Sequence, residues 1–292
     1  MRNLFIDQLV KEANKNKKII LLVGDLGFNV VEPFKKKFPE RFFNVGVSEQ
    51  SMIGMASGLA LSGFHVFVYS IANFPTFRCA EQIRNDVDYH NLPVTIVSVG
   101  SGLGYGNLGY SHHGLQDYSL MRSFPNTVIC SPSDNYELIK TLKYIFKYPQ
   151  PSYLRLDKSL DLNTKKFRTY LSPGKWILKI KGKDPKKLLA STGSVYKDCV
   201  NFLKKNKNNK YNWFSIPMWG MKSKNKQFKE LKKYKEIVTF ENHLQDGGFG
   251  SWINEILSLR NNNINIQNKF ISSEVIGKVG SENFLNKLYG PK

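Results

Sequence analysis

The chain has 292 residues, of which 41% are hydrophobic and 13% aromatic, so it is long and apolar enough for one large or two ordinary folded domains. Its longest wholly apolar run, "IILLV", has five residues, which argues against a membrane-spanning helix, and its acid-containing first segment does not resemble a signal peptide. The three cysteines lie far apart without metal-ligand spacing, so we expect a cytosolic, reducing environment.

The net charge of +20 is unevenly distributed. Residues 1–150 hold 15 Lys and Arg against 12 Asp and Glu, whereas residues 151–292 hold 28 against 11. The basic runs of the second half are rich in Lys and Asn but poor in Arg, the residue that supplies most specific phosphate and base contacts. We therefore expect solvated basic faces, and neither nucleic acid nor a membrane as a partner.

Residues 1–160 alternate between helix-like and strand-like segments. The first segment, Met1–Lys15, is predicted to be an amphipathic helix, and further helices are predicted from Glu49, over Pro75–His90 and over Ser133–Phe146. The predicted strands are Lys18–Gly24, Phe42–Gly46, His65–Ser70, Pro93–Gly100, Asn126–Ser131 and Ser152–Leu156.

Several of these strands are continuously apolar, which is typical of strands covered on both faces. The pattern predicts an α/β fold with a doubly wound, mostly parallel sheet. Active sites of such sheets lie at the carboxyl ends of the strands, so the loops after Gly24, Gly46, Ser70 and Gly100 are the places where chemistry is expected.

The rest of the chain predicts a second, smaller α/β domain. Residues 161–186 are expected to form a linker with some strand, and residues 187–292 the C-terminal domain. Its predicted strands are "KKLLAST", "YNWFSI", "EIVTFE" and "KFISSEV", with helices from Val195 and from Gly247 through Leu257.

The segment "NVGVSEQSMIGMASGLALSGF" (Asn44–Phe64) places one acid, Glu49, at the start of an almost wholly apolar helix, which we expect to be buried on most sides. An acid beside a capping Ser48 suits the positive end of a helix dipole, so Glu49 has an ordinary structural interpretation. A carboxylate that enters an apolar site is nevertheless costly unless another group uses it.

Two further loops follow predicted strand ends. "IANFPTFRCAEQIRND" contains Phe74 and Phe77, and "SGLGYGNLGYSHHGLQD" contains five glycines and the pair His112–His113. Taken singly, such aromatics are most often core residues and such histidines most often hydrogen-bond within the fold. The glycine-rich loop lacks the Gly-Lys-Ser/Thr ending of a phosphate loop. Together the loops would bring an acid, aromatic faces and imidazoles to neighbouring strand ends.

The order of these motifs is specific. "VGVSEQ", "YSIANFPTF", "EQIRND", "NLPV", "GYSHH", "SLMRSFPNTVICSPSD" and "PSYLRL" resemble, in that order, the pyrimidine-binding domain of transketolases and deoxyxylulose-phosphate synthases, over roughly residues 5–156. "VTFENHLQDGGFGSWINEIL" (Val238–Leu257) is similar to the signature of their C-terminal domain. The resemblance therefore spans nearly the whole chain.

The resemblance implies thiamine diphosphate as the cofactor. Glu49 holds the place of the glutamate that hydrogen-bonds the ring nitrogen of the aminopyrimidine, and burial favours the protonated carboxyl that this task needs. The aromatic residue that stacks on the pyrimidine would be Phe74 or Phe77, and the spacing does not decide between them. Asp25 and Leu26 match a segment near the thiazolium ring that is usually supplied across a dimer interface.

The resemblance also implies substrate contacts in the glycine-rich loop. His112 stands at the histidine of the family motif G-P-T-H-Q, which contacts the sugar, and His113 replaces the glutamine. Leu108 and Gly109 stand where many transketolases have Asp-Gly. This departure leaves the acceptor sugar open.

Two basic residues match phosphate-binding positions of relatives. Arg155 of "PSYLRL" matches an arginine that binds substrate phosphate, and Lys158 lies near a second such position. The alternative for Arg155 is a salt-bridged structural residue at the strand end. We expect the phosphate role.

The domain that holds the diphosphate and Mg²⁺ in this family carries a Gly-Asp-Gly stretch, which this chain lacks. No metal ligands are therefore assigned to the chain. The resemblance implies one subunit of a split transketolase that transfers ketol units between sugar phosphates or related sugars, with a homodimer of this chain inside a heterotetramer. The alternatives are the β subunit of a 2-oxo acid dehydrogenase, a deoxyxylulose-phosphate-synthase-like subunit, and a basic binding protein that has lost catalysis.

Overall fold

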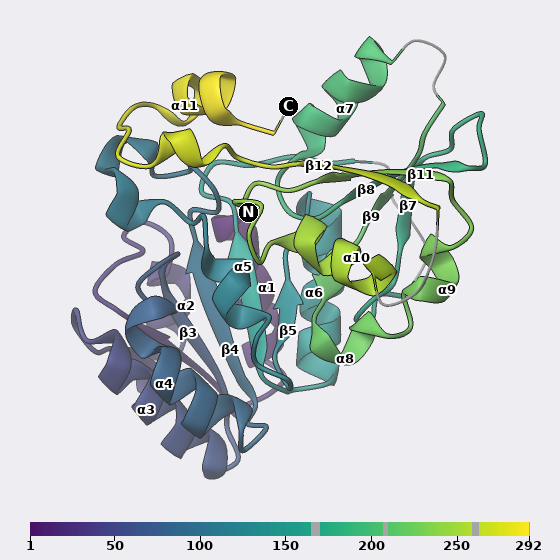
Figure 1. Cartoon of the computed structure of the whole chain (residues 1–292). Helices are drawn as coiled ribbons and strands as arrows, with labels where there is room; N and C mark the ends of the chain where they lie inside the picture. The colour runs from purple at the N-terminus through teal and green to yellow at the C-terminus, as the bar shows by residue number, and fades with distance from the viewer. Residues whose placement is uncertain (165–169, 207–209, 259–262, 292) are drawn as a thin grey trace.

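A computed structural model describes residues 1–164, 170–206, 210–258 and 263–291 (Figure 1). Within these ranges the strands form two sheets. The larger has the order β10-β5-β6-β4-β3-β1-β2 and is parallel except for β10. Its strands are β1 (Ile19–Val23), β2 (Phe42–Asn44), β3 (His65–Ile71), β4 (Val94–Val99), β5 (Val128–Cys130), β6 (Ser152–Leu156) and β10 (Met218–Trp219).

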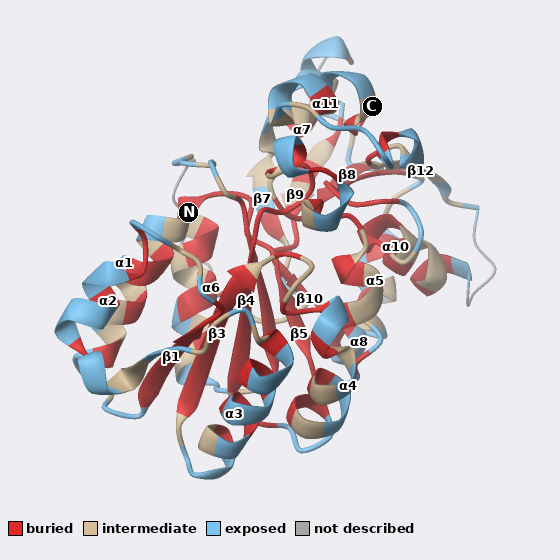
Figure 2. Cartoon of the chain, turned by 90° about the vertical axis from the view of Figure 1, so that its left-hand side faces the viewer, coloured by how far each residue is buried: buried red, intermediate tan, exposed pale blue. Residues whose placement is uncertain are grey.

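Helices cover both faces of this sheet. Side chains of α1 (Arg2–Ala13), α2 (Glu32–Lys37) and α6 (Asn135–Lys147) form the core on one face, and those of α3 (Glu49–Leu61) and α5 (Asp117–Met121) pack on the other. In β1, Ile19 and Leu21 join the first core, whereas Ile20 and Leu22 join the second. The fully buried strands in Figure 2 follow from this two-sided packing. The predicted doubly wound α/β sheet is confirmed.

The smaller sheet has the order β12-β11-β8-β9-β7 and is parallel except for β7. Its strands are β7 (Ile177–Ile180), β8 (Lys187–Ser191), β9 (Asn212–Ser215), β11 (Glu236–Phe240) and β12 (Asn265–Lys269). The C-terminal helices are α7 (Tyr196–Lys205), α8 (Met221–Lys224), α9 (Phe228–Leu231), α10 (Phe249–Ser258) and α11 (Glu282–Tyr289). We call this sheet, these helices and the segments that connect them the C-terminal domain.

The two domains share one apolar core. The antiparallel strand β10 lies between β9 and α8 in the chain, yet it pairs with β5 of the first sheet. Its Trp219 is fully buried, with ring centroids 5.1 Å from Tyr118 of α5 and 5.4 Å from Trp252 of α10. The C-terminal domain is therefore packed directly against the first domain.

Some predicted elements differ from the structure. The predicted helix over Pro75–His90 divides into η2 (Phe77–Cys79), α4 (Ala80–Gln82) and the π-helical η3 (Ile83–Asp88). The predicted strand "KFISSEV" is wrong, because β12 ends at its first residue and η6 (Ser273–Val275) follows. Three further short segments are 3-10 helices: η1 (Pro39–Arg41), η4 (Gly106–Leu108) and η5 (Tyr110–His112).

Residues 161–186, predicted to be a linker with some strand, contain β7, which belongs to the second sheet. One other expectation needs correction. Helix α3 is not buried on most sides, because Met55 and Leu61 are exposed, and Gly54 and Gly58 have open space beside them. In the ranges that the structure describes, no helix combines the length and apolar character needed to cross a membrane.

Candidate active site

Glu49 is the first residue of α3, and its side chain is only 1% exposed. Its Oε1 accepts a hydrogen bond from Ser70 Oγ at 3.2 Å, and its Oε2 accepts one from Arg78 Nη1 at 2.8 Å. A Cβ at Gly24 would lie 3.3 Å from Oε1, so the residue after β1 also closes on this carboxylate. Ser48 occupies the N-cap position, but its side chain makes no cap hydrogen bond. Glu49 therefore contacts the carboxyl ends of β1 and β3.

Arg78 is a functional candidate that the sequence reasoning missed. Its guanidinium carbon lies 4.3 Å from the centroid of the Phe74 ring while the same group donates to Glu49. A flat, N–H-bearing group thus stacks on an aromatic face and bonds a buried carboxylate. These two partners also suit an aminopyrimidine ring, so the residues present fit the cofactor that the resemblance implies. The signal that could have identified Arg78 was the Glu49 carboxylate. A buried Glu needs a charged or hydrogen-bonding partner, and Arg78 lies in the neighbouring motif.

A pocket of about 450 Å³ opens beside this pair. We call it the Phe74 pocket; it is lined by Asn73, Phe74, Phe77, Arg78, Tyr110, Ser111 and Gln116. Both candidate stacking aromatics line it. Phe74 contacts the Arg78 guanidinium and the His112 ring, whereas Phe77 is 47% exposed.

His112 lies next to this pocket, with its ring centroid 5.1 Å from that of Phe74 in an edge-to-face arrangement. Its Nδ1 lies 2.9 Å from Ser111 Oγ. Burial, together with the positive charge of Arg78, lowers the pKa of His112 below its ordinary value. The imidazole is therefore neutral at neutral pH, and it can both donate and accept a hydrogen bond.

His113 does not line the pocket. It is fully buried, and its Nε2 lies 3.4 Å from the carbonyl oxygen of Gly106. Burial lowers the pKa of this imidazole, so it is a neutral core residue. In this arrangement the predicted substrate contact of His113 is not supported. Gln116 and Tyr110, joined by a hydrogen bond of 2.7 Å, supply polar groups to the pocket instead.

Arg155 does not reach the pocket either. Its side chain is fully buried, and its Nε and Nη2 donate to both carboxylate oxygens of Asp117, at 2.6 and 3.2 Å. The other donors bond Tyr118 Oη, Asn242 Oδ1 and O, and the Gly114 carbonyl oxygen. All five N–H groups of a guanidinium have protein acceptors here, so none is left for a phosphate. The geometry corrects the phosphate expectation in favour of a structural role.

The remaining predicted residues lie outside the Phe74 pocket. Asp25 is exposed in the loop after β1, and it exchanges hydrogen bonds with Asn44 of 3.0 and 2.9 Å; Leu26 beside it is half-buried. Both lie at the same sheet edge as Glu49. Lys158 lines a different pocket, of about 900 Å³, with its Nζ 4.5 Å from the Tyr105 ring centroid. The structure therefore brings together Glu49, Phe74, Phe77 and His112, and leaves Lys158 apart.

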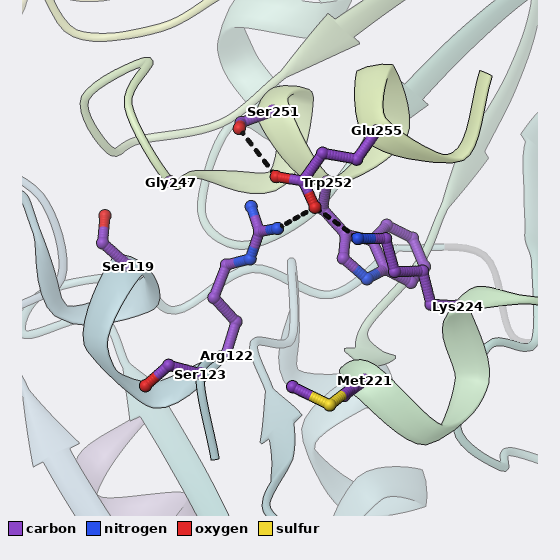
Figure 3. A pocket seen from close by; sticks show the side chains of 9 residues that line it. All are labelled: Ser119, Arg122, Ser123, Met221, Lys224, Gly247, Ser251, Trp252 and Glu255. Atoms are coloured by element: carbon purple, nitrogen blue, oxygen red, sulfur yellow. Dashed lines mark hydrogen bonds and ion pairs between the residues drawn. The ribbon is translucent and has the colours of Figure 1, made fainter. Parts of the chain in front are cut away.

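A third pocket, of about 400 Å³, lies between α5, α8 and α10 (Figure 3). Its two cations, Arg122 and Lys224, both form ion pairs with Glu255. It shares no lining residue with the Phe74 pocket. Because its charges are paired with one another, we interpret it as part of the seam between the domains.

Comparisons with known proteins bear on this site. A sequence profile described as "Transketolase, pyrimidine binding domain" matches residues 1–161. The chain is 32% identical over 295 residues to a provisionally named transketolase C-terminal section of Methanocaldococcus jannaschii, covering 99% of this chain and 92% of that protein. It is 28% identical over 295 residues to one of the subunits of the apulose-4-phosphate transketolase of Actinobacillus succinogenes, covering 99% and 94%.

A solved structure described as "Split gene transketolase, inactive beta4 tetramer" has the same fold. It superimposes with a TM-score of 0.85 at 26% identity, covering 100% of this chain and 93% of that one. The profile match covers more than half of the sequence, and the similarity to the M. jannaschii protein extends through both domains. The chain therefore belongs to the transketolase family and carries its pyrimidine-binding domain.

Proposed function

We propose that this chain is the pyrimidine-binding subunit of a two-chain transketolase, which transfers a two-carbon ketol unit between sugar phosphates or related sugars. The observation that carries the proposal is the meeting of the Glu49 carboxylate, the Phe74 ring and the His112 imidazole at one edge of the sheet. The names of the relatives, one a transketolase C-terminal section and the other a transketolase subunit, support it.

Thiamine diphosphate, the cofactor of this family, would supply a nucleophilic thiazolium carbon when it is bound. Glu49 is the residue that we expect to hold a proton at the ring nitrogen of the aminopyrimidine, and Ser70 orients its carboxyl group. We assign the stacking contact to Phe74 because the flat guanidinium group of Arg78 stacks on the face of its ring. His112, neutral and beside the pocket, is assigned to an oxygen of the sugar.

The chain lacks the Gly-Asp-Gly stretch, so we assign the diphosphate and Mg²⁺ to a partner subunit. The solved relative whose β chains form an inactive tetramer supports this division of labour. The exposed apolar face of α3, with Met55 and Leu61, is a suitable contact for a second subunit, because that helix carries Glu49. We therefore propose a homodimer of this chain within a heterotetramer.

The isolated chain is expected to bind thiamine diphosphate weakly or not at all, even with Mg²⁺, because it supplies only the pyrimidine side of the site. Titration calorimetry on the chain alone and with its partner subunit checks this. Ketol transfer from a ketose phosphate to an aldose phosphate should appear only when both chains are present. Tight, Mg²⁺-dependent binding by the chain alone would contradict the split-subunit proposal.

Arg78→Met is expected to strengthen cofactor binding by the two-chain enzyme about three- to tenfold. In the structure Arg78 contacts both Glu49 and Phe74, the two residues that we expect to bind the pyrimidine. Cofactor binding therefore has to displace a charge-assisted hydrogen bond. The effect is modest because the Arg78 side chain is 48% exposed and is solvated once it is displaced.

The measurement is the cofactor dissociation constant at fixed Mg²⁺. Arg84→Met is the matched control, since Arg84 belongs to η3, is exposed and donates to Asn85. Weaker binding by Arg78→Met would show that Arg78 supports the bound cofactor rather than competing with it.

A further inference from the structure

The loop that carries His112 rests on the C-terminal domain. It runs from Gly100 to Gln116, between β4 and α5. Its two buried leucines, Leu103 and Leu115, belong to a small apolar cluster of their own. The other buried members all come from the C-terminal domain: Leu244, Ile271, Val275 and Leu285. These two leucines therefore have their apolar support in the second domain, whereas Tyr105 of the same loop packs against the core of the first.

Backbone contacts strengthen this attachment. Gly280 N donates to the carbonyl oxygen of Gly106 at 3.2 Å, and Leu244 N donates to that of Leu115 at 3.0 Å. A Cβ at Gly106 would lie 2.6 Å from the Gly280 oxygen and 2.8 Å from a methyl of Leu285. Glycine is required at 106 because the C-terminal domain approaches so closely.

Asn242, which follows β11, links both ends of the same loop. Its Nδ2 donates to Ser101 Oγ at 3.2 Å, at the start of the loop. Its Oδ1 accepts from Arg155 Nη1 at 2.6 Å, and Arg155 Nη2 donates to the Gly114 oxygen at 2.6 Å, near the loop end. The two ends also bond each other through Gly102 and Gly114, at 3.0 and 2.9 Å.

His112 lies close in the sequence to the end of the loop that is attached to the C-terminal domain. His112 lies two residues before Gly114, and its backbone N–H bonds the Gly109 oxygen at 3.0 Å. On the opposite side Asn73 Nδ2 donates to the His113 oxygen at 2.7 Å, which holds the loop against the segment of Phe74. The loop that carries His112 is thus attached both to the C-terminal domain and to the segment of Phe74, whose ring contacts that of His112.

We propose that Asn242 and Leu285 of the C-terminal domain are positioning residues, which hold the glycine-rich loop so that the His112 imidazole faces the substrate. This inference rests on the proposed function, because it gives the C-terminal domain a task in ketol transfer although it contributes no side chain to the Phe74 pocket. Neither residue touches the pocket; each acts through the loop.

The test follows His112 in the purified chain by nuclear magnetic resonance, with its signals identified by their loss in His112→Gln. Asn242→Ala and Leu285→Ala are expected to weaken the ring contact between His112 and Phe74. They should also raise the titration midpoint of His112 toward the ordinary histidine value, because burial holds its pKa low. The milder Leu285→Val should shift the same signals less.

Two controls separate positioning from general stability. Leu189→Ala removes an equally buried leucine of the C-terminal domain from a cluster that contains no loop residue, and it should leave the His112 signals unchanged. Asn242→Asp keeps an acceptor for Arg155 and can accept from Ser101, so it should restore the His112 signals. Unchanged His112 signals in both Asn242→Ala and Leu285→Val would overturn the proposal and leave these residues a purely structural role.

Activity gives a separate result. In the two-chain enzyme, Asn242→Ala should lower kcat roughly 10- to 100-fold through misplacement of His112, with cofactor binding near wild type. Asn242→Asp should recover most of that loss. If the wild-type pair transfers no ketol group, the proposed function fails, whereas the resonance measurements on the chain still decide whether the C-terminal domain positions His112.

Discussion

Glu49→Gln is expected to slow cofactor activation about 10²- to 10⁴-fold, the range typical of a lost acid–base group. Glutamine keeps the shape of the side chain and can still contact Ser70 and Arg78, but its amide has no ionisable proton to transfer to a ring nitrogen. The measurement is exchange of the thiazolium C2 proton of the cofactor in the two-chain enzyme. The melting temperature of the chain should change little, because the ion-pair partner Arg78 is half-exposed.

Glu32→Gln is the matched control. Glu32 is likewise an acid in the first turn of a helix, α2, but it is exposed, and its carboxylate accepts a hydrogen bond from the backbone N–H of Asn29. It should leave C2 proton exchange at the wild-type rate. If Glu49→Gln behaves in the same way, Glu49 is only a helix-start acid, and the proposed catalytic role is lost.

Arg155→Met is expected to destabilise the fold by roughly 3–5 kcal/mol, because it leaves the buried carboxylate of Asp117 without its cation. Burial by itself would raise the pKa of Asp117, but Arg155 and His243 beside it lower that pKa below the ordinary value. The buried carboxylate therefore stays charged and depends on its partner. Thermal or urea unfolding of the chain measures the loss.

The double variant Arg155→Met with Asp117→Leu should recover a part of the lost stability, since removing both charges relieves the unpaired carboxylate. Enzyme assays separate this structural role from phosphate binding. A structural Arg155 predicts equal losses with phosphorylated and unphosphorylated ketoses. A loss confined to phosphorylated ketoses, in a chain of unchanged stability, would restore the phosphate role.

The sequence predicted the parts of the molecule that local patterns determine. The continuously apolar strands required burial on both faces, and the first sheet has that arrangement. Parallel strands bring their carboxyl ends to one edge, so Glu49, Phe74 and His112 could be expected close together before any distance was known.

Other features depend on contacts between distant residues, which no local sequence pattern predicts. His112 and His113 are neighbours in one motif, yet the end of a single helical turn directs one toward Phe74 and buries the other. An arginine at the end of a strand looks the same in the sequence whether it binds a substrate phosphate or an internal carboxylate. For Arg155 the partner is Asp117, which lies 38 residues earlier. Strand β10 has only two residues, too few for any periodicity.

That short strand bears on how such a protein can be rearranged in evolution. Met218 and Trp219 come from the C-terminal half of the sequence but complete the edge of the N-terminal sheet beside Cys130 and Ile129. A break in the gene between the two domains would leave that edge unpaired and separate Trp219 from Tyr118. Recombination is therefore expected to move this pair of domains as one module.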